Sequence, residues 1–164
     1  LLDDNTVKCW GANGAGQLGQ GDIANRGDNA GEMGSNLPAI NLGTDRKATS
    51  LSLGDAFTCA TLDDRTVKCW GYNGEAELGL GDTNHRGNDA DEMGDSLAAV
   101  AVSGSGQARS VSAGGAHACA LLDDYSLRCW GWNSFGEMGL GNKWGFGGYD
   151  DKMVSKLPPI VLTG

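Results

Sequence analysis

The sequence repeats itself with a period of 60 residues, and this repeat constrains the fold more than any other feature. The tripeptide Cys-Trp-Gly recurs in constant register at 9–11, 69–71 and 129–131. Leu-Asp-Asp precedes every copy by the same distance, and no insertion or deletion separates the copies. Because a repeat unit buries its apolar face against its neighbours, the chain is expected to form an array of similar structural units.

The boundaries of the units follow from this register. The repeats are expected at 1–60, 61–120 and 121–164, and the third lacks the last 16 residues of the unit. The segment 45–60 recurs at 105–120, with no further copy before Leu1 or after Gly164. We therefore expect a slice of a longer array, or one protomer of an assembly that completes its units across chain boundaries.

Each unit has the pattern of an all-β structure. Short apolar and β-branched runs alternate with clusters of Gly, Asp and Asn, and Gly accounts for 28 of the 164 residues. Antiparallel strands are expected at 48–53, 57–62, 66–71 and 98–102, with copies in the other units. Tandem four-stranded blades are expected, about three of them in the chain, either of the β-propeller type or in a blade-like β-solenoid. A polar loop of about 25 residues separates the third and fourth strands, and a loop of this length either folds on itself or carries function.

The cysteine spacing fits the expected hairpin. Pairing Leu62 with Thr66 across a three-residue turn places Cys59 directly opposite Cys69, at a separation that suits a disulfide. The same register pairs Cys119 with Cys129. The last turn residue should adopt a left-handed conformation, which suits Asn5 but strains Arg65 and Tyr125. The alternative to disulfide formation is that the cysteines bind zinc, although the short Cys-x2-Cys knuckle of zinc sites is missing.

Cys9 is the fifth and odd cysteine. Its expected partner would fall two positions before Leu1, so Cys9 is expected to pair outside this window or with another chain. Regular cysteine pairs are typical of an oxidising compartment, and we expect an extracellular, secreted protein.

Charge and hydropathy exclude several classes of partner. The net charge is −9, from 12 basic and 21 acidic residues, so the chain repels nucleic-acid phosphates and anionic membranes. The longest apolar stretch, Leu97–Val102, is far too short to span a bilayer. No nucleic-acid binding and no membrane insertion are expected.

The motif order resembles that of a known family. The core Trp-Gly-x-Asn-x2-Gly-x-Leu-Gly-x-Gly occupies 10–21 and 70–81, and it recurs at 130–141 with Met138 in place of Leu. This pattern resembles the regulator of chromosome condensation repeat. The resemblance implies four-stranded blades, normally seven to a closed propeller, and partner binding through the propeller loops. The longer unit and the cysteine pairs resemble a secreted, disulfide-bearing branch of that family.

Candidate ion and catalytic sites are few. The loops after Gly21 and Gly81 are rich in carboxylates and could bind Ca²⁺. The alternative is that Arg26 and Arg86 form ion pairs with the carboxylates of their own loops. The repeated Asp pairs, such as Asp63-Asp64, fall on turns and are expected to cap them. No nucleophile–base set or cofactor fingerprint is present, so we expect no enzyme and no cofactor.

One loop differs from its copies. Trp144, Phe146 and Tyr149 place three aromatic residues within six positions, which is typical of a binding loop, although a plug over the blade edge would use the same residues. The first functional hypothesis is an extracellular structural or adhesive repeat protein, a segment of a long array or filament that associates with itself or with neighbouring repeats. The alternative is a fragment of a seven-bladed propeller that binds a protein or glycan through its loops, in the manner of an exchange factor or inhibitor.

Overall fold

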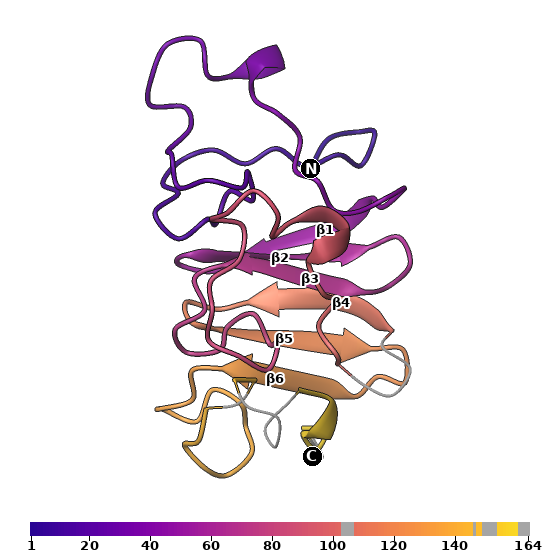
Figure 1. Ribbon diagram of the computed structural model, residues 1–164. Helices are drawn as coiled ribbons and strands as arrows, with labels where there is room; N and C mark the ends of the chain where they lie inside the picture. The colour runs from indigo at the N-terminus through magenta and orange to yellow at the C-terminus, as the bar shows by residue number, and fades with distance from the viewer. Residues whose placement is uncertain (103–106, 146, 149–153, 161–164) are drawn as a thin grey trace.

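The chain folds into two stacked antiparallel sheets with long loops (Figure 1). The computed structural model describes residues 1–102, 107–145, 147–148 and 154–160. The first sheet contains β1 (Ala48–Leu53), β2 (Phe57–Leu62) and β3 (Val67–Gly71), and the second contains β4 (Ala108–Ala113), β5 (His117–Leu122) and β6 (Leu127–Gly131). Single 3-10 turns follow the long loops at η1 (Gly34–Asn36), η2 (Gly94–Ser96) and η4 (Val154–Lys156). The all-β expectation is confirmed.

The two sheets share one strand order and one register. Both are meanders, β1-β2-β3 and β4-β5-β6, and each first strand carries a register shift at the same repeat position. Cys59 pairs with Cys69 across β2 and β3, as the turn geometry predicted. Arg65 has a φ of 65° and Tyr125 a φ of 64°, so both occupy the left-handed region that disfavours bulky side chains.

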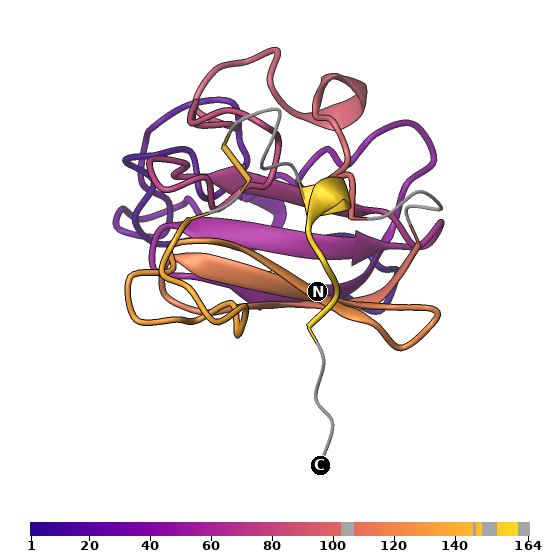
Figure 2. The same ribbon diagram turned by 90° about the horizontal axis from the view of Figure 1, so that it is seen from below.

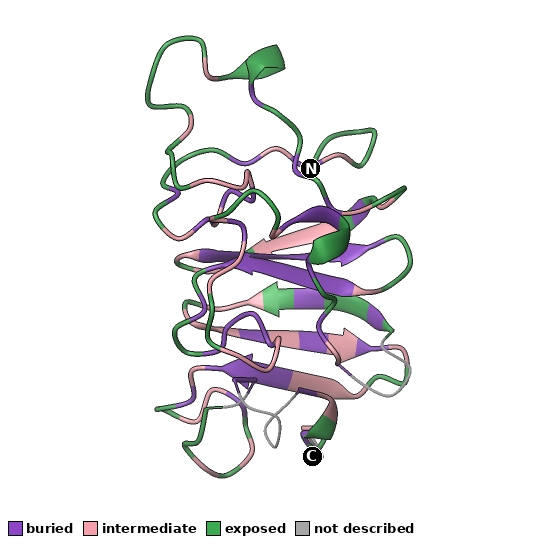
Figure 3. Ribbon diagram, viewed as in Figure 1, coloured by how far each residue is buried: buried purple, intermediate pink, exposed green. Residues whose placement is uncertain are grey.

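The two sheets differ in how far their strands are buried (Figure 3). Every residue of β2 and β3 is buried, whereas β5 alternates between buried and partly exposed positions. β2 and β3 lie between the first repeat and the second sheet, whereas β1 is only partly buried. Among the described residues, the first sheet covers one face of the second, and β5 has the period-two pattern of a half-covered strand. Viewed from below, the strands of the two sheets run in nearly the same direction (Figure 2).

A tryptophan and a loop carbonyl join successive units. Trp70 of β3 donates its indole N–H to the backbone oxygen of Gln17, 3.1 Å away, and Trp130 of β6 donates to that of Glu77 at 2.8 Å. Both indoles are completely buried. A buried indole N–H needs an acceptor, so the loop of each unit is fixed on the sheet of the next. Trp10, at the same repeat position, is 63% exposed.

The first repeat keeps the turn of the hairpin but not its strands. Leu2 donates its backbone N–H to the Thr6 oxygen at 2.9 Å, and Asn5 has a φ of 63°, as in the turns of the two sheets. Residues 6–10 follow the path of a third strand without being assigned as one. A strand is defined by its ladder, and among the described residues no segment pairs with residues 6–10 in the way that β2 pairs with β3.

The expected fourth strand is reduced to a single contact in each unit. Val100 donates its N–H to the Val67 oxygen at 2.8 Å, and Ile40 and Ile160 make the equivalent bonds to Val7 and Leu127. The ladder ends there in the second unit because Val102 donates its N–H back to Val100, which turns the chain away from β3. Each described sheet therefore has three strands, and the short fourth strand expected from the sequence is reduced to an edge segment with one backbone bond.

Candidate protein-binding loops

The long loop of each unit folds around one buried asparagine. The Asn73 amide donates to the backbone oxygens of Asp82 and Asn84 at 3.0 and 2.9 Å, and its Oδ1 accepts the N–H of Leu78 at 2.9 Å. Asn13 and Asn133 make equivalent bonds in their own loops, and all three side chains are buried. One side chain thus satisfies three backbone groups that the loop cannot pair among themselves.

Arginine holds the acidic part of the loop. Arg86 Nη2 lies 2.6 Å from Asp82 Oδ2, and the Arg86 backbone closes the loop by exchanging two hydrogen bonds with Gly71. Arg26 and Asp22 form the same pair at 2.5 Å. The Arg–Asp alternative raised by the sequence is therefore the arrangement found, and it commits one oxygen of each Asp. Within the described part of the chain, no three His, Cys, Asp or Glu side chains gather in a way that could hold a metal ion.

The third loop presents a tryptophan on a fixed backbone. The Asn133 amide donates to the Trp144 backbone oxygen at 2.8 Å, and the Trp144 N–H donates to Asn142 Oδ1 at 3.0 Å. The indole itself is 66% exposed. Phe146 and Tyr149, which the sequence grouped with Trp144, lie outside the described residues. The structure therefore places one of the three predicted aromatic residues at the surface, on a loop whose backbone is held from below.

Phe135 is a surface aromatic residue that the sequence reasoning missed. Its side chain is 86% exposed, and its backbone N–H donates to Glu137 Oε2 at 3.0 Å. The signal was present, because the other units carry Ala15 and Glu75 at this repeat position. Phe135 and Trp144 both belong to the loop that follows β6, and this loop lies at the edge of the sheet opposite the β5–β6 hairpin turn (Figure 1). We call Phe135 and Trp144 the aromatic pair of the third loop.

The cysteines occupy the centre of the stack. Disulfides join Cys59 to Cys69 and Cys119 to Cys129, with Cα–Cα distances of 4.1 and 4.0 Å. Cys9 is a free thiol, and burial raises its pKa. Each disulfide joins the two strands of the hairpin that precedes a long loop, so the disulfides stabilise the scaffold.

Two buried ionisable side chains are tied to backbone groups. Lys68 Nζ donates to the oxygens of Leu42 and Gly94 at 3.0 and 2.7 Å, and desolvation lowers its pKa. Glu77 accepts the N–H of Glu75 at 2.9 Å, and burial raises its pKa. Perturbed pKa values also occur at catalytic sites, but the hydrogen bonds that Lys68 and Glu77 make within the described residues join them to backbone groups. Both positions are structural supports for the loop.

The aspartate pairs are turn caps. Asp4 Oδ1 accepts hydrogen bonds from the N–H and the hydroxyl of Thr6 at 3.0 and 2.7 Å, and these bonds hold its pKa below the usual value. Asp64 makes the same two contacts with Thr66.

No helix among the described residues has the length and hydropathy needed to cross a membrane.

Stacked β-meanders joined by a tryptophan and held by inward-facing asparagines define the chain as a protein of the β-propeller repeat type. The regulator of chromosome condensation (RCC1) repeat matches residues 48–76 and 108–137. The chain thus contains two repeats of the RCC1 type, and it carries one disulfide in each of its two described sheets.

Similar proteins agree on the fold. The ultraviolet-B receptor UVR8 of Arabidopsis thaliana is 31% identical over 139 residues, which cover 84% of this chain and 28% of the receptor. Prp20p of Saccharomyces cerevisiae aligns with a TM-score of 0.67 and 21% identity over 99% of this chain and 36% of its own. Human WBSCR16 aligns with a TM-score of 0.58 and 20% identity, over 94% of this chain and 34% of its own.

The chain thus spans about a third of the length of these relatives. The Prp20p structure was described together with its binding properties to Gsp1p and histones. A second structure of the yeast protein, bound to Kap60, aligns with a TM-score of 0.61 and 20% identity. At this level of identity the solved structures establish the arrangement of the units.

Proposed function

We propose that the chain is a non-enzymatic, extracellular protein-binding segment of a propeller, and that its partner contacts the aromatic pair of the third loop. The observation that carries the proposal is the contrast between fixed backbone and exposed side chain at Trp144. Large aromatic side chains held in this way are effective binding anchors, since little conformational entropy is lost when they are buried.

Three further features support this assignment. Prp20p, which shares the fold, binds the proteins Gsp1p, histones and Kap60. Disulfides persist in oxidising compartments, which supports an extracellular location. Arginines hold Asp22 and Asp82, and Glu32 and Glu92 accept backbone N–H groups, which favours a binding role over an acid–base role for these four carboxylates.

The test compares two sets of surface variants. Phe135→Ala with Trp144→Ala removes the aromatic pair, and Tyr125→Asn is the matched control. Tyr125 is also an exposed aromatic residue, but it lies on a hairpin turn at the opposite edge, where the first unit carries Asn5. The three proteins are screened for binding to an array of extracellular proteins, and their unfolding temperatures verify the fold. Ligands lost only from the aromatic-pair variant are the expected result, and equal loss from the control contradicts the proposal.

A second candidate, a structural array, is favoured by the repeated contacts between units. The bond from Trp70 to Gln17 recurs from Trp130 to Glu77, and Gly21 donates to Gly87 as Gly81 donates to Gly147. Identical interfaces can propagate into an open filament unless their rotation closes a ring. Electron microscopy of unreduced native material distinguishes the two, because an array predicts long fibres and a propeller predicts discrete rings.

A further inference from the structure

His85 accepts a backbone hydrogen bond at the centre of the second loop. Its Nδ1 accepts the N–H of Asn73 at 3.1 Å, and Asn73 is the completely buried residue around which this loop folds. The imidazole also packs against the Tyr72 ring, with 4.8 Å between the ring centroids. Only the unprotonated nitrogen of an imidazole accepts a hydrogen bond, so this contact requires a neutral His85 with its proton on Nε2.

The first loop makes the same contact with a side chain that does not titrate. Asn25 holds the repeat position of His85, and its Oδ1 accepts the N–H of Asn13 at 3.0 Å. The third unit has Gly145 there, which offers no side-chain acceptor. An amide keeps its acceptor oxygen over the whole range in which an imidazole gains its proton, so the first loop is a reference for the second within one chain.

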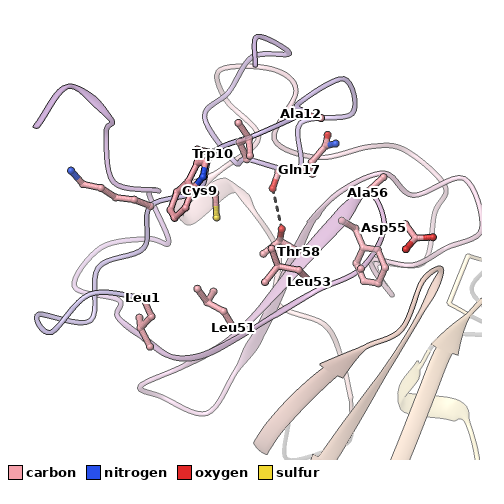
Figure 4. Close-up of a pocket in the computed structure, with 14 residues that line it drawn as sticks. Leu1, Cys9, Trp10, Ala12, Gln17, Leu51, Leu53, Asp55, Ala56 and Thr58 are labelled. Atoms are coloured by element: carbon pink, nitrogen blue, oxygen red, sulfur yellow. Dashed lines mark hydrogen bonds between the residues drawn. The ribbon is translucent and has the colours of Figure 1, made fainter. Parts of the chain in front are cut away.

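The two loops are anchored in the same way on the sheet that follows each of them. In the first loop the Gln17 oxygen accepts the Thr58 hydroxyl of β2 at 3.0 Å (Figure 4), and it also accepts the indole N–H of Trp70. In the second loop the Glu77 oxygen accepts the indole N–H of Trp130. A difference in acid sensitivity between the loops therefore reports the residue at position 25 or 85 rather than a different anchor.

A polar groove gives solvent protons access to His85. The groove has a volume of about 600 Å³, and the charged side chains that line it together with His85 are Arg86 and Glu92. Asp82 pairs with Arg86 at 2.6 Å, and the Tyr72 ring packs against the imidazole. These groups set the pH at which the ring gains its proton. They do not alter the consequence, because an imidazolium has two N–H donors and no acceptor.

We propose that the second loop is a pH-sensitive switch, in which a solvent proton on His85 Nδ1 breaks the bond to Asn73 and opens the loop. The imidazolium presents an N–H to the Asn73 N–H, and two donors at this distance repel each other. The ring turns toward the groove, and the buried N–H of Asn73 is left without its acceptor, which destabilises the closed loop. The contact stabilises the loop while His85 is neutral, and this stabilisation is lost as the pH falls.

The opening of the second loop reaches the third. Gly81 donates its N–H to the Gly147 oxygen at 2.8 Å, and a Cβ on Gly147 would lie 3.0 Å from the Ala76 oxygen. The second loop thus supports residues 147–148, which follow Trp144 closely in the third loop. Acid should therefore weaken binding through the aromatic pair. This consequence rests on the proposed function, whereas the opening of the second loop does not.

Hydrogen exchange of single amides tests the switch. The Asn73 amide reports the bond to His85, and the Asn13 amide is the internal reference because its acceptor is Asn25. Protection, which is the intrinsic exchange rate divided by the measured one, is compared at about pH 8 and about pH 5. In acid the Asn73 amide should lose protection about fivefold, which corresponds to one hydrogen bond, and the Asn13 amide should keep its protection. The Gly81 amide should follow Asn73.

His85→Asn is the matched variant, because it gives the second loop the acceptor of the first. The Asn73 amide of this variant should keep its protection at both pH values. Since Tyr72 packs against the imidazole, a second variant combines His85→Asn with Tyr72→Ala, the residue that Ala12 provides in the first unit. Glu77 of the same loop also titrates, but it is present in every chain, so the comparison between chains isolates His85.

The nitrogen-15 NMR signals of the imidazole provide a second readout. At about pH 8 the Nδ1 signal of His85 should be that of an unprotonated nitrogen, and the Nε2 signal that of an N–H. A neutral ring with its proton on Nδ1, an equal loss of Asn73 protection in the His85→Asn chain, or no loss in the wild-type chain would overturn the proposal. Partner binding by the aromatic pair is tested separately with Phe135→Ala and Trp144→Ala, at a pH where His85 is neutral.

Discussion

Trp10 and Trp70 provide an internal comparison of the same residue at the same repeat position. Trp70 is completely buried and Trp10 is 63% exposed. Truncation to alanine should therefore have very different costs at the two positions. A tryptophan side chain buries about 200 Å² when fully enclosed, and at about 25 cal/mol per Å² this is worth about 5 kcal/mol.

The expected costs follow from the exposed fractions. Trp70→Ala should lower the free energy of unfolding by about 5 kcal/mol, the upper end of the range for such truncations, since the bond to the Gln17 oxygen is also lost. Trp10 is only partly buried, so Trp10→Ala should lower the free energy of unfolding by only about 2 kcal/mol. The difference of about 3 kcal/mol is the quantity to be tested.

Guanidinium unfolding followed by circular dichroism, with the disulfides kept oxidised, measures both costs. The slopes of the transitions must agree, so that the free energies refer to the same cooperative unit. Trp70→Phe retains most of the apolar area and loses only the indole bond, so about 1 kcal/mol is expected for it. Equal costs for Trp10→Ala and Trp70→Ala would refute the reasoning, because the cost would then not follow the buried fraction of the two side chains.

Three further predictions concern the loops and the sheets. Burial raises the pKa of Glu77, so the protonated side chain favours the folded state, and this stabilisation is lost as the pH rises above the usual Glu range. Glu77→Gln should therefore become more stable relative to wild type between pH 4 and pH 7. Thermal unfolding of both proteins at the two pH values measures this difference. Asn133→Ala should cost about 2 kcal/mol by leaving the buried Met138 N–H without its acceptor, and faster hydrogen exchange confined to the third loop is the signature. Replacing Cys59 and Cys69 together by serine should cost about 3 kcal/mol, measured against wild type under oxidising conditions; a loss below 1 kcal/mol would show that the hairpin constrains the unfolded chain without its disulfide.

The repeat register allowed much of the scaffold to be predicted. The turn at Asp63-Asp64-Arg65 set the pairing of β2 with β3, and that pairing brought Cys59 to Cys69. These are short-range consequences of residue order, and they hold because a three-residue turn admits one register. The strained left-handed residues, Arg65 and Tyr125, were predictable for the same reason.

The fourth strand and the surface aromatic residues were less accessible to sequence reasoning. The segment at 98–102 has strand-like composition, but a local turn at Val102 limits it to one bond with Val67. Phe135 was overlooked because it lies outside the aromatic run that begins at Trp144. Asn133 donates a hydrogen bond to the Trp144 backbone oxygen, and this bond between the two parts of the loop cannot be read from the residue spacing.

The sequence by itself determined the period, the hairpin register and the cysteine pairing, because all three depend on neighbours close along the chain. Only the tertiary structure decided how far each of the repeated tryptophans is covered. Trp10, Trp70 and Trp130 share one motif, yet burial depends on whether a preceding loop lies across the indole. Burial is a property of distant segments, and identical repeats therefore acquire different surfaces from their neighbours.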